Sequence, residues 1–422
     1  MERLEIENFL CIKKAELEIK RFNVIIGPQA SGKSVLAKLA FFFKEIFKIQ
    51  FQESILRRES ESEFVRNCKL KFEEIFPPYA WRKTFNVVYR RGKNDSINDN
   101  NNIWVSITYE HDTDNLDLKY SPEFSEFYNS QIKRIQTEID HPDESNQMDR
   151  EFSSYVSFLI DARNSFRDYF DLDNVFIPAT RSIIALMQKN MFSLMPNKVK
   201  IDPFLESFGI EYDSLKKKYG SKTTYELLKA LHDEMSPLVN EVIGGKYEHK
   251  DGDWIVNGDT KTKLEDASSG QQEAVPMLVY LSVYPHVDIS EGITYFIEEP
   301  ESHLFPKAQK QIVSILATLY NLCESNYFIT THSPYILTAI NNLITAEQAY
   351  STGKNNQRVE ELVPMNQHLS YDDIAAYTIK DGVLCSIMDE ENKIIGPSII
   401  DDVSDEFDST FDGLLDVLYE GK

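Results

Sequence analysis

The sequence has little cysteine and no long apolar run, and these two absences narrow the class of protein. It has 422 residues and four scattered cysteines, none of them in a C-x-x-C pair. This scarcity argues against a disulfide framework or a cysteine zinc site and fits a reducing cytosol. No apolar run reaches the length of a transmembrane helix. The opening MERLEIENF lacks a basic region followed by an apolar core, so we expect a cytoplasmic protein without a secretory signal or membrane contact.

The charge balance is strongly acidic. The chain has 45 lysines and arginines against 68 aspartates and glutamates, a formal net charge of −23. Such a surface repels phosphate backbones on average, so contact with nucleic acid would need a local basic patch or a partner protein. The simpler interpretation is that the charge keeps the protein soluble. The hydrophobic content of 42% is ample for a buried core, and the length indicates a main domain with a sizeable insert.

The pattern of apolar residues divides the chain into four parts. Residues 1–54 predict a strand hairpin, a buried strand and a helix, whereas residues 55–172 predict a mostly helical insert with a β-hairpin. Residues 173–345 alternate helices and strands and include short antiparallel strands, and residues 346–422 form an acidic C-terminal extension. The first and third parts together predict one α/β head. The biased segment RGKNDSINDNNN at residues 91–102 predicts a polar loop within the insert.

A phosphate-binding loop lies between an apolar strand and a helical pattern. Residues 27–34 read GPQASGKS and match G-x-x-x-x-G-K-S, directly after the apolar run 22–26. The glycines allow backbone conformations that turn N–H groups toward phosphate oxygens, and the helix N-terminus adds a favourable dipole. We expect Lys33 to reach the β- and γ-phosphates and Ser34 to offer its hydroxyl to Mg²⁺. The expected nucleotide-binding residues here are Gly27, Gln29, Ala30, Ser31, Gly32, Lys33 and Ser34.

A second apolar run ends in two carboxylates. Residues 293–297 read ITYFI and are followed by Glu298, Glu299 and Pro300. Adjacent side chains on a strand point to opposite sides, so the two carboxylates can have separate roles. We expect Glu298 to help hold Mg²⁺ and Glu299 to polarise the water that attacks the γ-phosphate. Taken alone, the pattern also describes a strand that ends in an exposed acidic turn, but the phosphate loop in the same chain favours catalysis.

Two further segments resemble parts of ABC-type ATPases. Residues 267–273, ASSGQQE, predict a serine-capped helix start and resemble the ABC signature loop, which binds the γ-phosphate of ATP held by the opposite subunit. Residues 328–334, FITTHSP, resemble the switch-histidine loop, in which His332 would hydrogen-bond the γ-phosphate. Taken alone, a helix cap and a structural histidine are the simpler interpretations. The residues that the signature resemblance assigns to nucleotide binding are Ser268, Ser269, Gly270 and Gln271.

Together the motifs resemble the overcoming-lysogenisation-defect and recombination-factor-F-like branch of ABC ATPases. The opening run LEIENF at residues 4–9 and EEPESHLFP at residues 298–306 are similar to that branch. The segment IPATRS at residues 177–182 resembles a strand end of its defence-associated members, where Arg181 would face the nucleotide or the dimer seam, or form a structural salt bridge. The family usually has aspartate where this chain has Glu298. The resemblance implies an ABC-type P-loop ATPase head with a mixed sheet and an antiparallel lobe.

The resemblance also implies a way of acting. Many members carry a C-terminal Toprim nuclease, but too few residues follow His332 for that domain, and Asp401, Asp402 and Asp405 lie in an acidic, loop-like tail. The chain therefore resembles the stand-alone ATPase subunits of anti-phage systems such as PARIS and Septu. Such a subunit would use ATP and Mg²⁺ and pair head to head with a second copy, as a dimer or a higher oligomer. It would control a separate effector protein, expected to be a nuclease, with a phage protein or DNA as the trigger.

Two alternatives stay open at this point. The first is a DNA-maintenance ATPase of the recombination-factor-F or SMC type that clamps DNA, against which the net charge of −23 counts. The second is a scaffold that binds ATP without hydrolysing it, because Glu298 departs from the family pattern at the metal position. Salt-dependent DNA binding that requires ATP would support the first. An absence of phosphate release would support the second.

Overall fold

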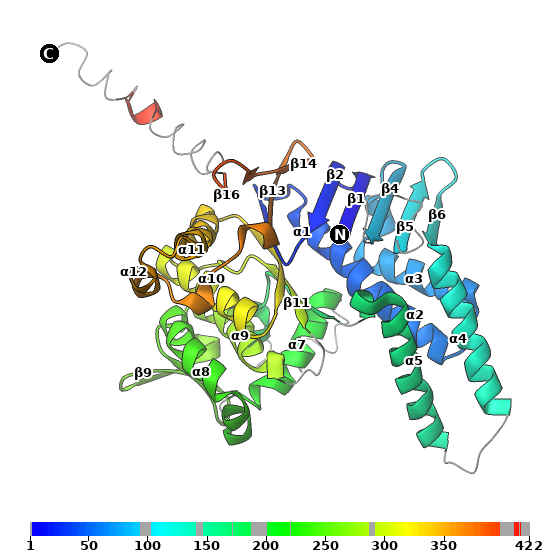
Figure 1. Cartoon of the computed structure of the whole chain (residues 1–422), viewed down its shortest axis with the longest axis horizontal. Helices are drawn as coiled ribbons and strands as arrows, with labels where there is room; N and C mark the ends of the chain where they lie inside the picture. Colours follow the sequence, from blue (N-terminus) through cyan, green and yellow to red (C-terminus); the bar gives the residue numbers. More distant parts are fainter. Residues whose placement is uncertain are drawn as a thin grey trace.

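The computed structural model describes most of the chain as helices around one large sheet (Figure 1). The pair α4 and α5 extends away from the body of the molecule. No helix in the described part of the chain is long and apolar enough to cross a membrane. The structure describes residues 2–92, 103–140, 147–170, 172–186, 201–219, 221–286, 292–396, 409–412 and 414.

One mixed sheet of eleven described strands runs through the molecule in the order β6-β5-β4-β1-β2-β14-β13-β3-β12-β11-β7. Its parallel part consists of β7 (Asp173–Ile177), β11 (Ile293–Glu298), β12 (Asn326–Thr331), β3 (Phe22–Ile26) and β13 (Ile374–Lys380). Its antiparallel part consists of β1 (Glu2–Phe9), β2 (Ile12–Ile19), β4 (Phe85–Arg91), β5 (Ile103–Glu110) and β6 (Asn115–Tyr120). The strand β14 (Val383–Ser386) joins the two parts, antiparallel to β13 and parallel to β2.

Each face of the sheet has its own hydrophobic core, because neighbouring residues on a strand point to opposite faces. On β3, Val24 belongs to one core and Ile25 to the other, and on β11 Tyr295 and Phe296 divide in the same way. All residues of β3 and β11 are buried, as expected for parallel strands covered by helices on both faces. Because the strands themselves are buried, a ligand can reach them only at the loops that follow their carboxyl ends. The candidate site lies at these ends.

Two groups of helices cover the two faces of the sheet. The first face packs against α7 (Pro203–Lys216), α8 (Lys222–Ile243), α9 (Ser269–Val283), α10 (Pro306–Leu322) and α11 (Pro334–Ser351), with α12 (Asn356–Leu362) on α11. The second face packs against α1 (Lys33–Phe41), α2 (Phe47–Leu56), α3 (Glu61–Ile75), α4 (Pro122–Asp140) and α5 (Gln147–Phe170), with a π-helical segment (Phe42–Ile46) between α1 and α2.

The remaining elements are short. A three-stranded sheet contains β8 (Lys246–His249), β9 (Asp253–Asn257) and β10 (Thr260–Lys263), and β15 (Met388–Asp389) pairs with β16 (Ile394–Ile395). Short 3-10 segments occur at Pro78–Ala80, Leu264–Asp266, Tyr284–His286, Met365–Gln367 and Tyr371–Asp373.

The predicted fold class is confirmed, with a mixed α/β sheet, an antiparallel lobe and many helices. The sheet nevertheless draws strands from all four parts of the chain. Strands β4 to β6 come from residues 55–172 and extend the sheet beside β1, where we expected only a hairpin within the insert. Strand β13 comes from the expected extension 346–422 and pairs with β3. The boundaries between the four parts stay an interpretation, and residues 93–102 and 397–408, which include the tail aspartates, lie outside the described residues.

Candidate nucleotide-binding site

The phosphate loop connects the end of β3 to the start of α1, in the predicted strand–loop–helix context. Gly32 caps the helix with a φ of 108°, and Ala30 also has a positive φ of 57°. A Cβ atom at Gly32 would lie 2.9 Å from Sγ of Cys11, so the position excludes a side chain both by conformation and by space. Ser34 is exposed in the first turn of the helix, where a hydroxyl can meet a ligand.

Lys33 is buried and folds back over its own loop. Its Nζ donates hydrogen bonds of 2.8 Å to the carbonyl oxygens of Gly27 and Pro28. The same Nζ lies 3.3 Å and 3.1 Å from Nδ1 and Nε2 of His332. Burial lowers the pKa of Lys33 below its usual value, although nearby carboxylates, Glu299 foremost, act in the opposite direction. The ammonium group is thus held where a phosphate bound in the loop would compete for it.

The two carboxylates at the end of β11 have different partners, because Glu298 is the last residue of the strand and Glu299 begins the loop with a left-handed backbone. Glu299 has a φ of 44°, and its N–H donates to the carbonyl oxygen of Thr330 at 2.8 Å. Its carboxylate accepts a hydrogen bond of 3.1 Å from Ser302 Oγ, and its Oε1 lies 3.3 Å from Nε2 of His332. Glu298 is buried instead, and its Oε2 accepts a long bond of 3.4 Å from the N–H of Ala179.

His332 follows β12, the strand between β3 and β11, and its loop is fixed by a carboxylate. Glu301 Oε1 accepts a hydrogen bond of 2.7 Å from the N–H of His332 and another of 2.7 Å from the hydroxyl of Thr331. Lys33, His332 and Glu299, which we predicted to be catalytic, therefore lie within contact of one another. Sequence reasoning assigned no role to Glu301. The sequence feature that could have identified Glu301 is its position two residues after Glu299. The loop that contains both glutamates follows β11, and β11 lies beside β12, the strand that His332 follows.

Glu298 and Ser34 fit a Mg²⁺ ion that would accompany a nucleotide. Among the described residues, Oε1 of Glu298 is buried and has no hydrogen-bond partner, which leaves a carboxylate oxygen available. The described residues contain no cluster of three or more His, Cys, Asp or Glu side chains suited to a metal. Mg²⁺ keeps several waters and uses one or two protein ligands plus phosphate oxygens, and one carboxylate oxygen and one hydroxyl can supply that protein share.

The predicted signature segment begins α9. Ser268 is the N-cap, and its side chain and that of Gln271 form a capping box, so this serine has the structural role of a cap. Ser268 and Ser269 are exposed. A Cβ atom at Gly270 would lie 2.7 Å from the carbonyl oxygen of His303, so the helix start packs closely on the loop that follows Glu299. Among the described residues, no hydrogen bond joins this segment to the phosphate loop of the same chain.

Arg181 lies in the interior, not at a ligand-accessible surface. Its side chain is fully buried and donates to four backbone carbonyl oxygens, those of Pro178, Glu273, Glu298 and Glu299. Of the alternatives that we considered, contact with nucleotide or the dimer seam is therefore wrong, and the structural role holds. Burial lowers the pKa of the guanidinium, opposed by the carboxylate of Glu273, which lies 3.7 Å from Nε.

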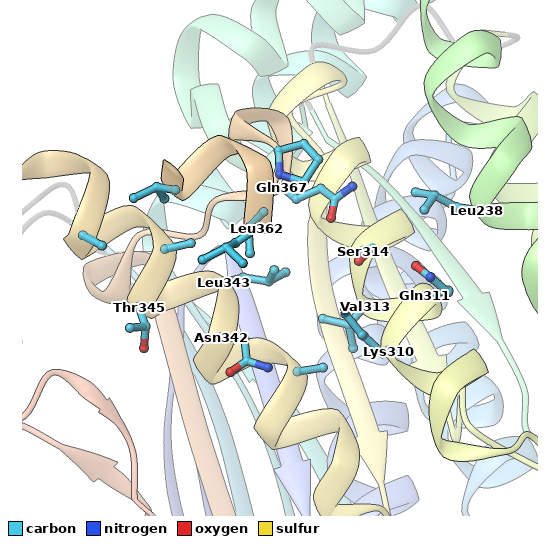
Figure 2. Close-up of a pocket in the computed structure, with 16 residues that line it drawn as sticks. Leu238, Lys310, Gln311, Val313, Ser314, Asn342, Leu343, Thr345, Leu362 and Gln367 are labelled. Carbon is cyan, nitrogen blue, oxygen red and sulfur yellow. The ribbon is translucent and has the colours of Figure 1, made fainter. Parts of the chain in front are cut away.

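A groove of about 530 Å³ lies elsewhere, among α8, α10, α11 and α12 (Figure 2). Its lining is mostly apolar, with Leu343 and Leu362 among the labelled side chains. Lys310 carries the only charge among the described residues that line it. None of the predicted site residues lines this groove, so the motifs and not the groove define the candidate site.

The comparison with protein families agrees with this geometry. The model of the AAA ATPase domain family matches residues 1–337, which include the phosphate loop, the carboxylates after β11 and His332. The chain belongs to the AAA ATPase domain family. No curated protein matches the chain.

Three solved structures align with nearly the whole chain at low identity. The SMC head domain from Thermotoga maritima is 12% identical, with 92% of this chain and 98% of that chain covered and a TM-score of 0.39. The recombination mediator protein RecF bound to an ATP analogue is 16% identical, with 91% and 97% covered and a TM-score of 0.31. The ATP-binding cassette of an ABC transporter in its ADP conformation is 12% identical, with 93% of each chain covered and a TM-score of 0.30.

Proposed function

We propose that this AAA-family chain binds and hydrolyses ATP with Mg²⁺. The observation that carries the proposal is the contact of Lys33, His332 and Glu299 at the ends of three neighbouring strands, β3, β12 and β11. Lys33 would leave the loop carbonyls for the β- and γ-phosphates, and His332 would hydrogen-bond the γ-phosphate. Glu299 would orient and polarise the attacking water, whose oxygen bonds to the γ-phosphorus as the bond to the β-phosphate oxygen breaks.

Mg²⁺, when bound, would neutralise charge on the β- and γ-phosphates, and Ser34 and Glu298 are the residues that would hold it. The other residues act through charge and position. Gly27 and Gly32 let the loop bring its N–H groups close to the phosphates, and Ser302 holds the Glu299 carboxylate in place with its hydroxyl. Lys33 and Glu298 are buried, which strengthens their electrostatic interactions relative to water.

We further propose that a second copy of the chain completes each site. Ser269, exposed in the first turn of α9 beside the cap Ser268, has no hydrogen bond to its own phosphate loop among the described residues, so its hydroxyl is available to a nucleotide on another copy. Two large apolar side chains beside the site support such a contact. Phe305 is 79% exposed in the loop after β11, and Tyr335 is 55% exposed just beyond His332. Exposed aromatic side chains of this size are typical anchors of protein interfaces.

We place this ATP-driven pairing in anti-phage defence, where it would control a separate effector protein, expected to be a nuclease. The support is the resemblance of the motifs to stand-alone defence ATPases and the net charge of −23, which disfavours direct DNA binding. Loss of the γ-phosphate removes two or three charge-assisted hydrogen bonds of roughly 1.5–3 kcal/mol each, and three such bonds of average strength exceed the roughly 5.5 kcal/mol that inverts a two-state closure. Capture of tagged Glu299→Gln with ATP and Mg²⁺ from its native cell tests this. A stoichiometric nuclease supports effector control, whereas DNA without a protein partner indicates DNA maintenance.

The ATPase proposal itself is tested with Glu299→Gln and the matched control Glu324→Gln. Glu324 is an exposed glutamate in the loop between α10 and β12, at the opposite end of that strand from His332. Glu299→Gln should bind ATP like the wild type, release phosphate at least about a hundredfold more slowly, as expected for loss of general-base catalysis, and stay dimeric with ATP. The control should release phosphate at the wild-type rate. Equal rates for Glu299→Gln and wild type would refute the role of Glu299.

A further inference from the structure

Arg181 connects three elements that the proposed reaction needs. It follows β7, and its Nη1 donates to the carbonyl oxygens of Pro178 at 2.9 Å and Glu298 at 2.8 Å. Its Nη2 donates to the carbonyl oxygen of Glu299 at 2.9 Å, and its Nε to that of Glu273, on α9, at 2.9 Å. The guanidinium thus bonds at once to the backbone of the water-orienting glutamate and to the helix that carries the signature segment.

A buried charge with these bonds is a poor way merely to hold a fold together. Replacing a buried ion pair with apolar side chains is often neutral or stabilising, because desolvation offsets the attraction. What a guanidinium supplies and an apolar residue does not is a rigid fork of donors that fixes several acceptors relative to one another. Here the fixed acceptors are the carbonyl oxygens of Glu273 and Glu299, so the position of one depends on the position of the other.

A second contact joins the same two elements. Gly270, in the first turn of α9, packs so closely on the carbonyl of His303 that a methyl group would lie 2.7 Å from it. The loop that contains His303 begins at Glu299, whose positive φ turns the chain away from the strand. A shift of the first turn of α9 is therefore transmitted to the Glu299 segment from both sides, through Gly270 and through Arg181.

We propose that Arg181 is a positioning residue that couples the two nucleotide sites of the dimer. The inference rests on the proposed function, in which the start of α9 touches the nucleotide of the other copy. Engagement of Ser269 and Gly270 by that nucleotide sets the position of α9, and Arg181 transmits it to Glu299 of the same chain. Glu299 then acts on the nucleotide in its own phosphate loop only when the partner site is also filled.

The test uses mixed dimers of two differently tagged copies, one of them carrying Lys33→Ala so that only one site can fill. With coupling, the wild-type mixed dimer should hydrolyse ATP about tenfold more slowly than the wild-type homodimer, a typical coupling between sites. Arg181→Lys keeps the charge but cannot bridge the three elements. When both copies carry Arg181→Lys and one also carries Lys33→Ala, this mixed dimer should hydrolyse ATP at half the rate of the Arg181→Lys homodimer, because each site then acts alone. The ratio of the mixed-dimer rate to the homodimer rate does not depend on any general loss of activity that Arg181→Lys causes.

Arg21→Lys is the matched control, since Arg21 precedes β3 at the end of that strand opposite the phosphate loop, where it contacts Tyr320 and Asp373. Its ratio should equal that of the wild type, and thermal unfolding should show every variant folded. A wild-type ratio of one half, or an unchanged low ratio in Arg181→Lys, would overturn the coupling. If Arg181→Lys does not fold, Arg181→Met, which removes every donor of the guanidinium from these carbonyl oxygens, replaces it, with the same two outcomes. No hydrolysis by the wild-type homodimer would instead refute the proposed function.

Discussion

Nζ of Lys33 lies 3.1 Å from Nε2 of His332, and that nitrogen lies 3.3 Å from Oε1 of Glu299. Glu299 and His332 directly follow the adjacent parallel strands β11 and β12, and the loop after the next strand, β3, brings Lys33 at the start of α1 beside them. Loop carbonyl oxygens and nearby carboxylates compensate the charge of the lysine. The Lys33 ammonium group is therefore already in place when a phosphate group enters the loop. It would exchange the loop carbonyl oxygens for phosphate oxygens as its hydrogen-bond acceptors.

Lys33→Ala should nearly abolish ATP binding. The ammonium would make charge-assisted hydrogen bonds to two phosphates, and losing roughly 1.5–3 kcal/mol for each weakens binding by about a hundredfold or more. Titration with a fluorescent ATP analogue measures the dissociation constant. Lys310→Ala, an exposed lysine of α10 outside the site, is the control and should bind like the wild type. Equal affinity for Lys33→Ala would show that the loop carbonyls, not phosphate, are its partners in function.

Glu301→Gln should slow hydrolysis while leaving ATP affinity almost unchanged. The carboxylate accepts two bonds of 2.7 Å that fix the His332 loop, and its other oxygen is buried without a partner among the described residues. An amide weakens these bonds and buries an unsatisfied N–H₂ group, so we expect kcat to fall about tenfold through misplacement of His332. Steady-state kinetics separate the parameters. A raised KM with an unchanged kcat would show that Glu301 serves binding instead.

The local parts of the site could be predicted from the sequence, because they depend on contiguous residues. The phosphate loop, the carboxylates after β11 and the histidine after β12 each follow a short apolar strand, and parallel strands align such ends at one edge. Strand β13 could not be placed, although its own pattern is strand-like. It pairs with β3, about 350 residues earlier, and nothing in a local pattern names so distant a partner.

Arg181 shows a second limit of the sequence. A single arginine after a strand is equally compatible with a ligand contact and a structural bond, because the deciding acceptors lie on α9 and β11. The same holds for β4, whose alternation predicts a half-buried strand but not that it would extend the main sheet beside β1. In both cases the missing information is tertiary: which backbone groups the fold brings within reach.

Phe305→Glu should prevent ATP-dependent pairing without unfolding the chain. The ring is 79% exposed beside the site, so its loss costs little in the monomer, whereas a buried aromatic anchor contributes about 2 kcal/mol or more to an interface. In the Glu299→Gln background with ATP, analytical ultracentrifugation should show a monomer for Phe305→Glu. Leu362→Glu changes an apolar residue of α12 that is 65% exposed away from the site and should stay dimeric. A dimer in both variants would place the interface elsewhere.

A buried cluster at the edge of β1 predicts a pH-dependent loss of stability. Glu2 lies 2.9 Å from Nζ of Lys44 and 3.4 Å from the guanidinium of Arg91. Burial raises the pKa of Glu2, but the two cations more than offset this and hold it below the usual value. A carboxylate with a lowered pKa in the folded state stabilises the fold fully above the pKa it has when unfolded. That stability is lost as the pH falls through the lowered value.

Glu2→Gln should therefore destabilise the protein at neutral pH by about 3–5 kcal/mol, the usual effect of leaving buried cations without their partner. The difference from wild type should shrink as the pH falls from the ordinary glutamate pKa through the lowered value, because the wild-type carboxylate is then protonated and loses the same charge. Urea unfolding at neutral pH and in mild acid measures both free energies. Glu16→Gln removes a carboxylate from an exposed pair with Lys14 and should leave the unfolding midpoint unchanged at either pH. A Glu2→Gln difference that is constant with pH would mean that the side chain contributes by packing, since only the charge titrates.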